Sequence, residues 1–346
     1  MRVCVVGAGA IGGLVGAQLA RAGESVTLVD VGAQLAALRR DGLTVIAPHG
    51  ETRVVRGLTC TDSFEEAGEQ DLVLLAVKAQ RIAEVAEPMR ALLGPETAVV
   101  TLQNGLPWWY FHRHGGEMDG WRLESLDPDG RIERHLEPGR ILGCVAYPAA
   151  ALERPGVIRH LYGDRFPVGE PSGGPSRRAR AIAELFVRAG FRSEVLDDVR
   201  AELWLKAVGA VAFNPISALA RATMAGICRH PATRALAVEL MAEAESVAAR
   251  LGVTLRVPVA RRLSGAEKVG EHKTSMLQDV EAGRSLEVEA ILGSVIEVGR
   301  RLGVATPRLD TIYACCRLLD ESLAARRAAL DRGRGGYSEL SSETSS

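Results

Sequence analysis

Apolar residues fall at strand and helix spacings in turn along the first half of this 346-residue chain. The uninterrupted apolar runs within residues 2–6 and 71–78 predict strands covered on both faces, as in a parallel sheet between helices. This alternation predicts an α/β fold with a doubly wound sheet. The other predicted elements are strands at residues 25–29, 98–102, 141–148 and 157–168, helices at residues 14–22, 34–40 and 81–93, and a hairpin of residues 42–45 and 53–58.

Helical spacing dominates the second half of the chain. One apolar stripe falls on Ile182, Leu185, Phe186 and Ala189, and long helical patterns recur at residues 197–220, 231–251 and 285–302. Residues 169–175 read Gly-Glu-Pro-Ser-Gly-Gly-Pro, which is typical of a linker. The patterns predict a sheet domain at residues 1–172, a mostly α-helical domain at 173–330, and a charged, serine-rich disordered tail at 331–346.

A glycine turn joins the first strand to the first helix. The motif Gly7-x-Gly9-x-x-Gly12 lies between them, and Asp30 closes the next strand. In this context the first glycine permits the turn, the second lets the backbone approach a pyrophosphate, and the third brings the helix close to the strand. The turn therefore predicts dinucleotide binding at the helix N-terminus. The residues expected to bind the dinucleotide there are Gly7, Gly9, Ala10, Ile11 and Gly12.

Polar side chains follow two further predicted strands. Lys78 ends the strand at residues 71–78, and Asn104 follows the strand at 98–102. Ligands of open α/β sheets bind outside the carboxyl ends of the strands, so both side chains are candidates for the binding site. A solvated lysine and a simple turn asparagine are the alternatives.

An aromatic segment occupies residues 107–138, where three of the four tryptophans gather. Large apolar rings are rarely exposed without reason, so the segment either packs on the sheet edge or forms a lid or a subunit contact. His112 and His114 have no cysteine or carboxylate at a ligand spacing, so no metal site is predicted there.

The predicted helix at residues 197–220 carries a lysine in very apolar surroundings. Lys206 and Asn214 are two helical turns apart and share one face, and Pro215 is expected to bend the helix. A buried ammonium needs a partner or an aqueous cleft, unless its stem lies along the surface. Further candidates are Ser275, near a helix start, and Glu287, in a first helical turn where its charge also suits the helix dipole.

Charge and cysteine content exclude several classes of protein. The 42 basic and 43 acidic residues leave no net field for nucleic acid or anionic membranes. No signal-peptide pattern opens the chain, and no uninterrupted apolar run reaches the roughly 18 residues that span a bilayer, so we expect a soluble, cytoplasmic protein. The six cysteines form no CxxC pair and are expected to be small buried hydrophobes.

These motifs together resemble the ketopantoate reductases (2-dehydropantoate 2-reductases), over nearly all of the chain to about residue 330. The matching pieces are Gly7-x-Gly9-x-x-Gly12, Val77-Lys78, Gln103-Asn104-Gly105, the helix with Lys206 and Asn214-Pro-Ile-Ser-Ala-Leu, and Ser275-Met-Leu-Gln-Asp279 with Glu287.

The resemblance implies an N-terminal Rossmann-type domain followed by an α-helical domain, and a reductase of pantothenate biosynthesis. Hydride would pass from a nicotinamide cofactor to a small 2-oxo acid, 2-dehydropantoate, with Lys206 as the general acid. Glu287 and Asn214 would hold the substrate hydroxyl and orient the lysine. The remaining implied roles are carboxylate binding by Ser275 and contacts at the nicotinamide and substrate end by Lys78 and Asn104.

Two departures from the family pattern bear on cofactor and substrate. Members usually carry an Asn one turn after the lysine, where this chain has Ala210, which removes a polar contact. Members that use NADPH tend to place an Arg just after the second strand, where this chain has Asp30 followed by Val31. Asp30 would accept from a ribose 2′-OH and repel a 2′-phosphate, which favours NAD over NADP. Arg39 and Arg40 follow several residues later and keep NADP open.

Two alternatives therefore stand beside the reductase. One is an NAD-dependent dehydrogenase of another 2-hydroxy acid, which Ala210 and Asp30 both favour. The other is a nucleotide-sensing protein without turnover, against which Lys206 and Glu287 argue because a sensor needs no proton donor. The helical domain and the aromatic segment offer surfaces for a homodimer.

Overall fold

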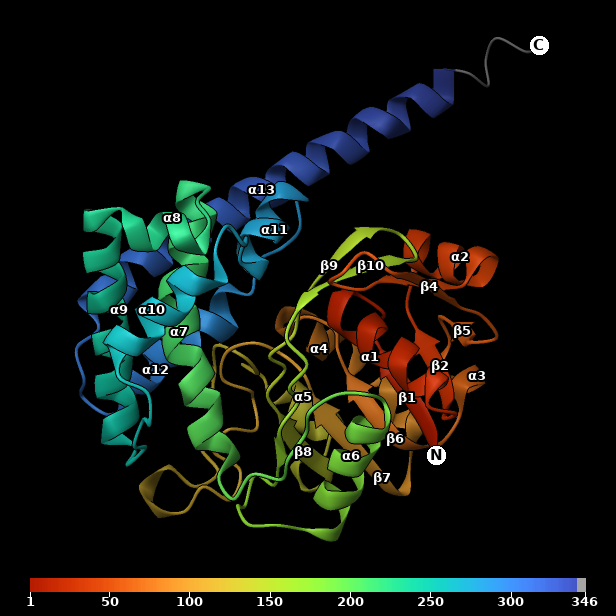
Figure 1. Ribbon diagram of the computed structural model, residues 1–346, viewed down its shortest axis with the longest axis horizontal. Helices are drawn as coiled ribbons and strands as arrows, with labels where there is room; N and C mark the ends of the chain where they lie inside the picture. The colour runs from red at the N-terminus through yellow and green to blue at the C-terminus, as the bar shows by residue number, and fades with distance from the viewer. Residues whose placement is uncertain (341–346) are drawn as a thin grey trace. The chain divides into compact units, whose positions relative to one another are not determined.

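The computed structural model describes residues 1–340, with their side chains as far as residue 329. The chain divides into two compact units, the first Met1–Lys206 and the second beginning at Ala207 (Figure 1). The sequence predicted the division near residue 172. The first unit extends further because α6 (Arg177–Arg188) buries Ile182, Leu185 and Phe186 in the same apolar core as the first strands.

The first unit is built on a seven-stranded sheet in the order β11-β8-β7-β6-β1-β2-β5. Its strands are β1 Arg2–Val6, β2 Ser25–Val29, β5 Thr59–Thr61, β6 Gln70–Leu75, β7 Leu93–Thr101, β8 Ile141–Cys144 and β11 Val168–Gly169. Every pair is parallel except β11 with β8. In the central register Val5 of β1 faces Leu28 on one side and Leu74 on the other, so the apolar runs form the core. The predicted α/β class with a Rossmann-type sheet is confirmed.

A second, four-stranded sheet was not predicted as a separate layer. It has the order β4-β3-β10-β9, and its strands are β3 Leu43–Ile46, β4 Thr52–Val55, β9 Ala149–Arg154 and β10 Val157–Tyr162. The predicted hairpin is confirmed as β3 and β4. The later strands pair with it through β3 and β10, whereas the sequence had assigned residues 157–168 to the main domain without a second sheet. Helix α1 (Ala10–Arg21) contacts strands of both sheets.

Short helical turns replace one predicted helix. Residues 81–93 form η1 Ala79–Arg81, α4 Ile82–Val85 and η2 Pro88–Leu92, followed directly by β7. Pro88 lacks the N–H that a continuous helix would need, which explains the break. The other helical segments of the first unit are α2 Gly32–Asp41, α3 Phe64–Ala67, η3 Gly116–Met118, α5 Arg131–His135, η4 Pro138–Arg140 and α6.

Helices, joined by loops, are the regular secondary structure of the second unit within its described residues. Helix α7 (Val199–Ala220) begins in the first unit and ends in the second, with Pro215 inside it. The others are α8 Met224–Arg229, α9 Pro231–Arg250, α10 Val259–Val269, α11 Ser275–Glu281, the π-helical η5 Glu289–Gly293, α12 Ser294–Arg301 and α13 Pro307–Leu340. The structure thus describes helix over residues 331–340, where a disordered tail was predicted, and residues 341–346 lie outside the described residues.

Helix α7 is the one helix within residues 1–340 whose length and composition would allow it to cross a membrane. About 61% of its most apolar window is buried inside the protein, as in a core helix. The expectation of small buried cysteines holds for Cys4, Cys144, Cys228 and Cys316. It is wrong for Cys315, which is exposed on α13, and Cys60 is only half-buried.

Candidate functional site

The glycine turn brings β1, β6 and α1 into close contact. Gly7 has φ +97°, and a Cβ there would lie 2.8 Å from the backbone nitrogen of Val77. A Cβ on Gly12 would lie 2.0 Å from the carbonyl oxygen of Gly7, so neither position accepts a side chain without movement. A Cβ on Gly9 would meet no other atom within 4 Å, and no side chain caps the N-terminus of α1. The first turn of α1, with Ala10 and Ile11, therefore presents backbone N–H groups beside open space.

Asp30 at the end of β2 holds this turn. One carboxylate oxygen accepts from the N–H of Ala8 at 2.7 Å, and the other accepts from the N–H of Val31 at 2.7 Å. Burial raises the pKa of the Asp30 carboxyl above its usual value, although both hydrogen bonds and the charge of Arg81 act in the opposite direction. A carboxylate accepts more than two hydrogen bonds, so these contacts leave capacity for a ribose hydroxyl.

Arg81 is a residue that the sequence analysis missed. It lies in η1, three residues after Lys78, and its charge acts on the Asp30 carboxyl. Lys78 is half-buried at the start of η1 and follows Val77, which abuts Gly7. The sequence feature that could have identified Arg81 is its position as a second cation, after Lys78, in the segment that follows a core strand. Both cations thus belong to the loop that leaves β6 beside the glycine turn.

Gln103 joins the ends of two neighbouring strands. Its Nε2 donates to the carbonyl oxygens of Leu75, at 2.7 Å, and Val77, at 2.9 Å. Gln103 lies just after β7, and both carbonyls lie at the end of β6. This side chain therefore ties the segment that carries Lys78 to the segment that carries Asn104.

Lys206 on α7 meets these strand ends. Its Nζ donates to Oδ1 of Asn104 at 2.8 Å and to the carbonyl oxygen of Ala146 at 2.6 Å. The sequence predicted that this lysine needs a partner, and the structure supplies two acceptors from the carboxyl ends of β7 and β8. Asn104 is therefore more than a turn residue, and two of the predicted site residues are in direct contact.

The remaining predicted residues belong to the second unit. Asn214 is half-buried on α7, and Ser275 is exposed at the first position of α11, whose N-terminus is capped by Thr274. Glu287 is only 6% exposed and precedes η5 rather than lying in a first helical turn, while its carbonyl accepts from the N–H of Ile291. The geometry within the second unit does not assign a ligand contact to any of these three residues.

The aromatic segment packs into the first unit, which favours packing over a lid or a subunit contact. Trp109, Tyr110 and Phe111 are buried, and the Tyr110 hydroxyl accepts from Nε1 of Trp204 at 2.7 Å. Arg200 on α7 donates to the carbonyl oxygens of Tyr110 and of residues 112 and 171. Within the described part of the chain, no group of three His, Cys, Asp or Glu side chains could hold a metal ion.

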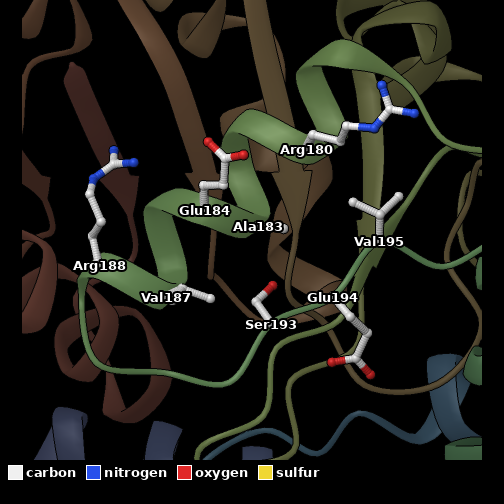
Figure 2. A pocket seen from close by; sticks show the side chains of 8 residues that line it. All are labelled: Arg180, Ala183, Glu184, Val187, Arg188, Ser193, Glu194 and Val195. Atoms are coloured by element: carbon white, nitrogen blue, oxygen red, sulfur yellow. The ribbon is translucent and has the colours of Figure 1, made fainter.

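A hollow of about 490 Å³ lies over α6, and its lining residues are separate from those described above (Figure 2). Charged side chains of both signs line it, and none of the predicted site residues does. Its lining is Arg180, Ala183, Glu184, Val187, Arg188, Ser193, Glu194 and Val195.

Comparisons with known proteins match this arrangement. The family models "Ketopantoate reductase PanE/ApbA" and "Ketopantoate reductase PanE/ApbA C terminal" match residues 3–173 and 198–320. The chain is 44% identical to a 2-dehydropantoate 2-reductase of Mesorhizobium japonicum over 96% of this chain and 99% of that one, and 33% identical to one of Archaeoglobus fulgidus over 88% and 92%.

Comparison with solved structures indicates the same family as the two sequence relatives. A crystal structure of a Ralstonia solanacearum protein assigned to the ketopantoate reductases superposes with a TM-score of 0.88 at 40% identity. The match covers 93% of this chain and 98% of that one. The chain therefore belongs to the ketopantoate reductase family and is an oxidoreductase of the 2-dehydropantoate 2-reductase kind.

Proposed function

We propose that this protein reduces 2-dehydropantoate to pantoate with a nicotinamide cofactor and with Lys206 as the general acid. The observation that carries the proposal is the position of the Lys206 ammonium, 2.8 Å from Oδ1 of Asn104 and 2.6 Å from the carbonyl oxygen of Ala146. Asn104 follows β7, and the glycine turn follows β1, so both lie at the carboxyl edge of one parallel sheet. A proton donor at this edge lies where α/β folds bind their ligands.

The chain's own residues fit the cofactor. The open space at Gly9 and the uncapped N–H groups of Ala10 and Ile11 suit a pyrophosphate, whose charge the helix dipole also favours. When bound, the reduced nicotinamide supplies the hydride. Gly7 and Gly12 keep the turn tight enough for the backbone to approach the pyrophosphate.

We propose NADH as the preferred cofactor over NADPH. The Asp30 carboxylate is placed by Ala8 and Val31 beside the turn, where it can accept from a ribose 2′-OH and would repel a 2′-phosphate. Arg81 acts against this preference, because a guanidinium binds phosphate well. The preference is therefore set by the balance of these two side chains.

Lys206 supplies the proton and offsets charge at the reacting carbonyl. As hydride adds to carbon 2 of the 2-oxo acid, the carbonyl oxygen gains the electron pair of the broken π bond and takes a proton from Nζ. The products are the 2-hydroxy acid and the oxidised cofactor, and the amine of Lys206 regains its proton from solvent. Asn104 and Ala146 orient the ammonium, because Oδ1 of Asn104 and the carbonyl oxygen of Ala146 each accept a hydrogen bond from Nζ.

We assign the substrate contacts of the second unit by family resemblance. Ser275 would donate to the substrate carboxylate, and Asn214 and Glu287 would hold the substrate hydroxyl and orient Lys206. These residue types suit the polar groups of pantoate. The homodimer and the cytoplasmic location expected from the sequence stay predictions.

Ala210 favours a second candidate, the NAD-dependent dehydrogenation of another 2-hydroxy acid. It lies one helical turn after Lys206 on α7, where the family usually carries Asn. A site that lacks one amide would discriminate less strongly for the polar groups of ketopantoate.

The test is a steady-state assay of NADH and NADPH oxidation with 2-dehydropantoate and a panel of other 2-oxo acids. We expect turnover of 2-dehydropantoate and a loss of about 100-fold or more in kcat for Lys206→Met. Preferred turnover of another 2-oxo acid would support the second candidate. Nucleotide binding without turnover of any substrate would instead identify a sensor.

A further inference from the structure

The peptide group between Ala146 and Tyr147 is held from both sides. Its carbonyl oxygen accepts from Nζ of Lys206 at 2.6 Å, and its N–H donates to the carbonyl oxygen of Arg165 at 3.1 Å. A trans peptide is planar and its C=O and N–H point in opposite directions. The bond to Arg165 therefore fixes the direction in which the Ala146 carbonyl meets Lys206.

The side chains of Tyr147 and Arg165 both bind one buried carboxylate, that of Glu202. Oε1 of Glu202 accepts from the Tyr147 hydroxyl at 2.6 Å and from Nη1 of Arg165 at 2.6 Å. The Arg165 guanidinium also lies over the Tyr147 ring, 5.0 Å from its centroid. Tyr147, Arg165 and Glu202 form what we call the Glu202 cluster.

Glu202 is also linked to Lys206 through α7. The two residues are one helical turn apart and so lie on the same face of the helix. Glu202 is only 7% exposed, and a buried carboxylate is tolerated when it is paired and hydrogen-bonded. The cluster thus connects the helix that carries Lys206 to the peptide that accepts from it.

We propose that Glu202 is a positioning residue for Lys206, acting through Tyr147 and Arg165 to hold the Ala146 carbonyl under the ammonium. The inference rests on the proposed role of Lys206 as the general acid. If so, the cluster affects mainly the rate of the chemical step. A small misplacement of a proton donor lowers kcat strongly while it changes the stability of the fold little.

Glu194 provides a matched control. It binds the same guanidinium, accepting from Nε of Arg165 at 2.8 Å. Its side chain is 46% exposed, whereas that of Glu202 is 8% exposed, and Glu194 lies outside α7. Loss of its charge perturbs the Arg165 ion pair without touching the Tyr147 hydroxyl bond.

The experiment compares Glu202→Gln, Tyr147→Phe and Glu194→Gln in the full-length protein. We measure kcat, the KM of each substrate, the thermal midpoint, and the primary isotope effect with cofactor deuterated at the transferred position. For Glu202→Gln and Tyr147→Phe we expect kcat to fall by about tenfold or more, a larger isotope effect, and little change in the KM of the cofactor. Glu194→Gln should stay within about twofold of wild type, as expected of an exposed ion pair.

The double variant tests whether the cluster acts as one unit. If it does, Tyr147→Phe with Glu202→Gln lowers kcat no further than the stronger single change. Tyr147→Phe decides the matter if Glu202→Gln does not fold, because it removes only one oxygen atom.

Each outcome separates the two proposals. Unchanged kcat and isotope effect in the folded variants, with Lys206→Met inactive, would overturn the positioning role alone. Full activity of Lys206→Met would overturn the general-acid role and the positioning role with it.

Discussion

The ammonium of Lys206 lies 2.8 Å from Oδ1 of Asn104, a residue 102 positions earlier in the chain. One partner comes from a long apolar helix and the other from the loop that follows β7. The contact joins the only lysine of α7 to the edge of the parallel sheet, which is where the proposed carbonyl-reducing site needs a cation.

Replacing Asn104 with Leu should therefore lower kcat by roughly tenfold to 100-fold, since a hydrogen bond to a charged group contributes about 1.5–3 kcal/mol. Leu keeps the size of the side chain but gives Lys206 no acceptor. The measurement is kcat at saturating cofactor and substrate, with the thermal midpoint as a check on folding. An unchanged kcat in a folded variant would show that the contact does not orient the proton donor.

The glycine turn offers a pair of substitutions that separate folding from binding. An alanine Cβ at Gly12 would lie 2.0 Å from the Gly7 carbonyl oxygen, so Gly12→Ala should destabilise the protein by about 1–3 kcal/mol. A Cβ on Gly9 would meet nothing within 4 Å and the φ of Gly9 is an ordinary −71°, so Gly9→Ala should leave the thermal midpoint unchanged. It should still weaken cofactor binding, because its methyl group occupies the space of the pyrophosphate. Calorimetric titration with NADH decides, and full affinity in Gly9→Ala would contradict the assigned cofactor position.

Asp30 should give cofactor binding a pH dependence. Burial raises the pKa of its carboxyl, so on acidification this carboxylate is protonated at a higher pH than an ordinary Asp. A protonated carboxyl is a poorer acceptor for a ribose hydroxyl. As the pH is lowered, NADH affinity should therefore begin to fall at a higher pH than it would with an exposed Asp. Asp30→Asn should remove this dependence and reduce the preference for NADH over NADPH. Tighter binding of NADPH than NADH by the wild-type protein would refute the assigned preference.

Local signals explain what could be predicted. The strand, the three glycines and the helix of the glycine turn are contiguous, so residues 2–22 specify their own geometry. The apolar surroundings of Lys206 likewise indicated that it needs a partner. Neither acceptor could be identified, because Asn104 is distant in sequence and the Ala146 carbonyl is backbone, which side-chain patterns do not reveal.

Long-range pairing accounts for most of what the sequence did not show. Strand β10 pairs with β3 across more than a hundred residues, and its half-buried outer positions look the same in the sequence whichever sheet it joins. Arg81 was predicted only as the first residue of a helix at residues 81–93. The turn at Ala79–Arg81 places its charge near Asp30 instead.

Gln103 allows a last prediction with a control in the same strand pair. Its Nε2 holds two carbonyls at the carboxyl end of β6, and Nε2 of Gln70 holds the carbonyls of Ala67 and Gly68 at the opposite end. Replacing either with Leu leaves two carbonyls of buried or half-buried residues without that donor, so each should cost about 1–3 kcal/mol of stability. Gln103→Leu alone should also raise the KM of the cofactor and lower kcat, because it loosens the segments that carry Lys78 and Asn104. Equal kinetic effects of the two variants would mean that the loss of activity follows stability and that Gln103 does not align the strand ends.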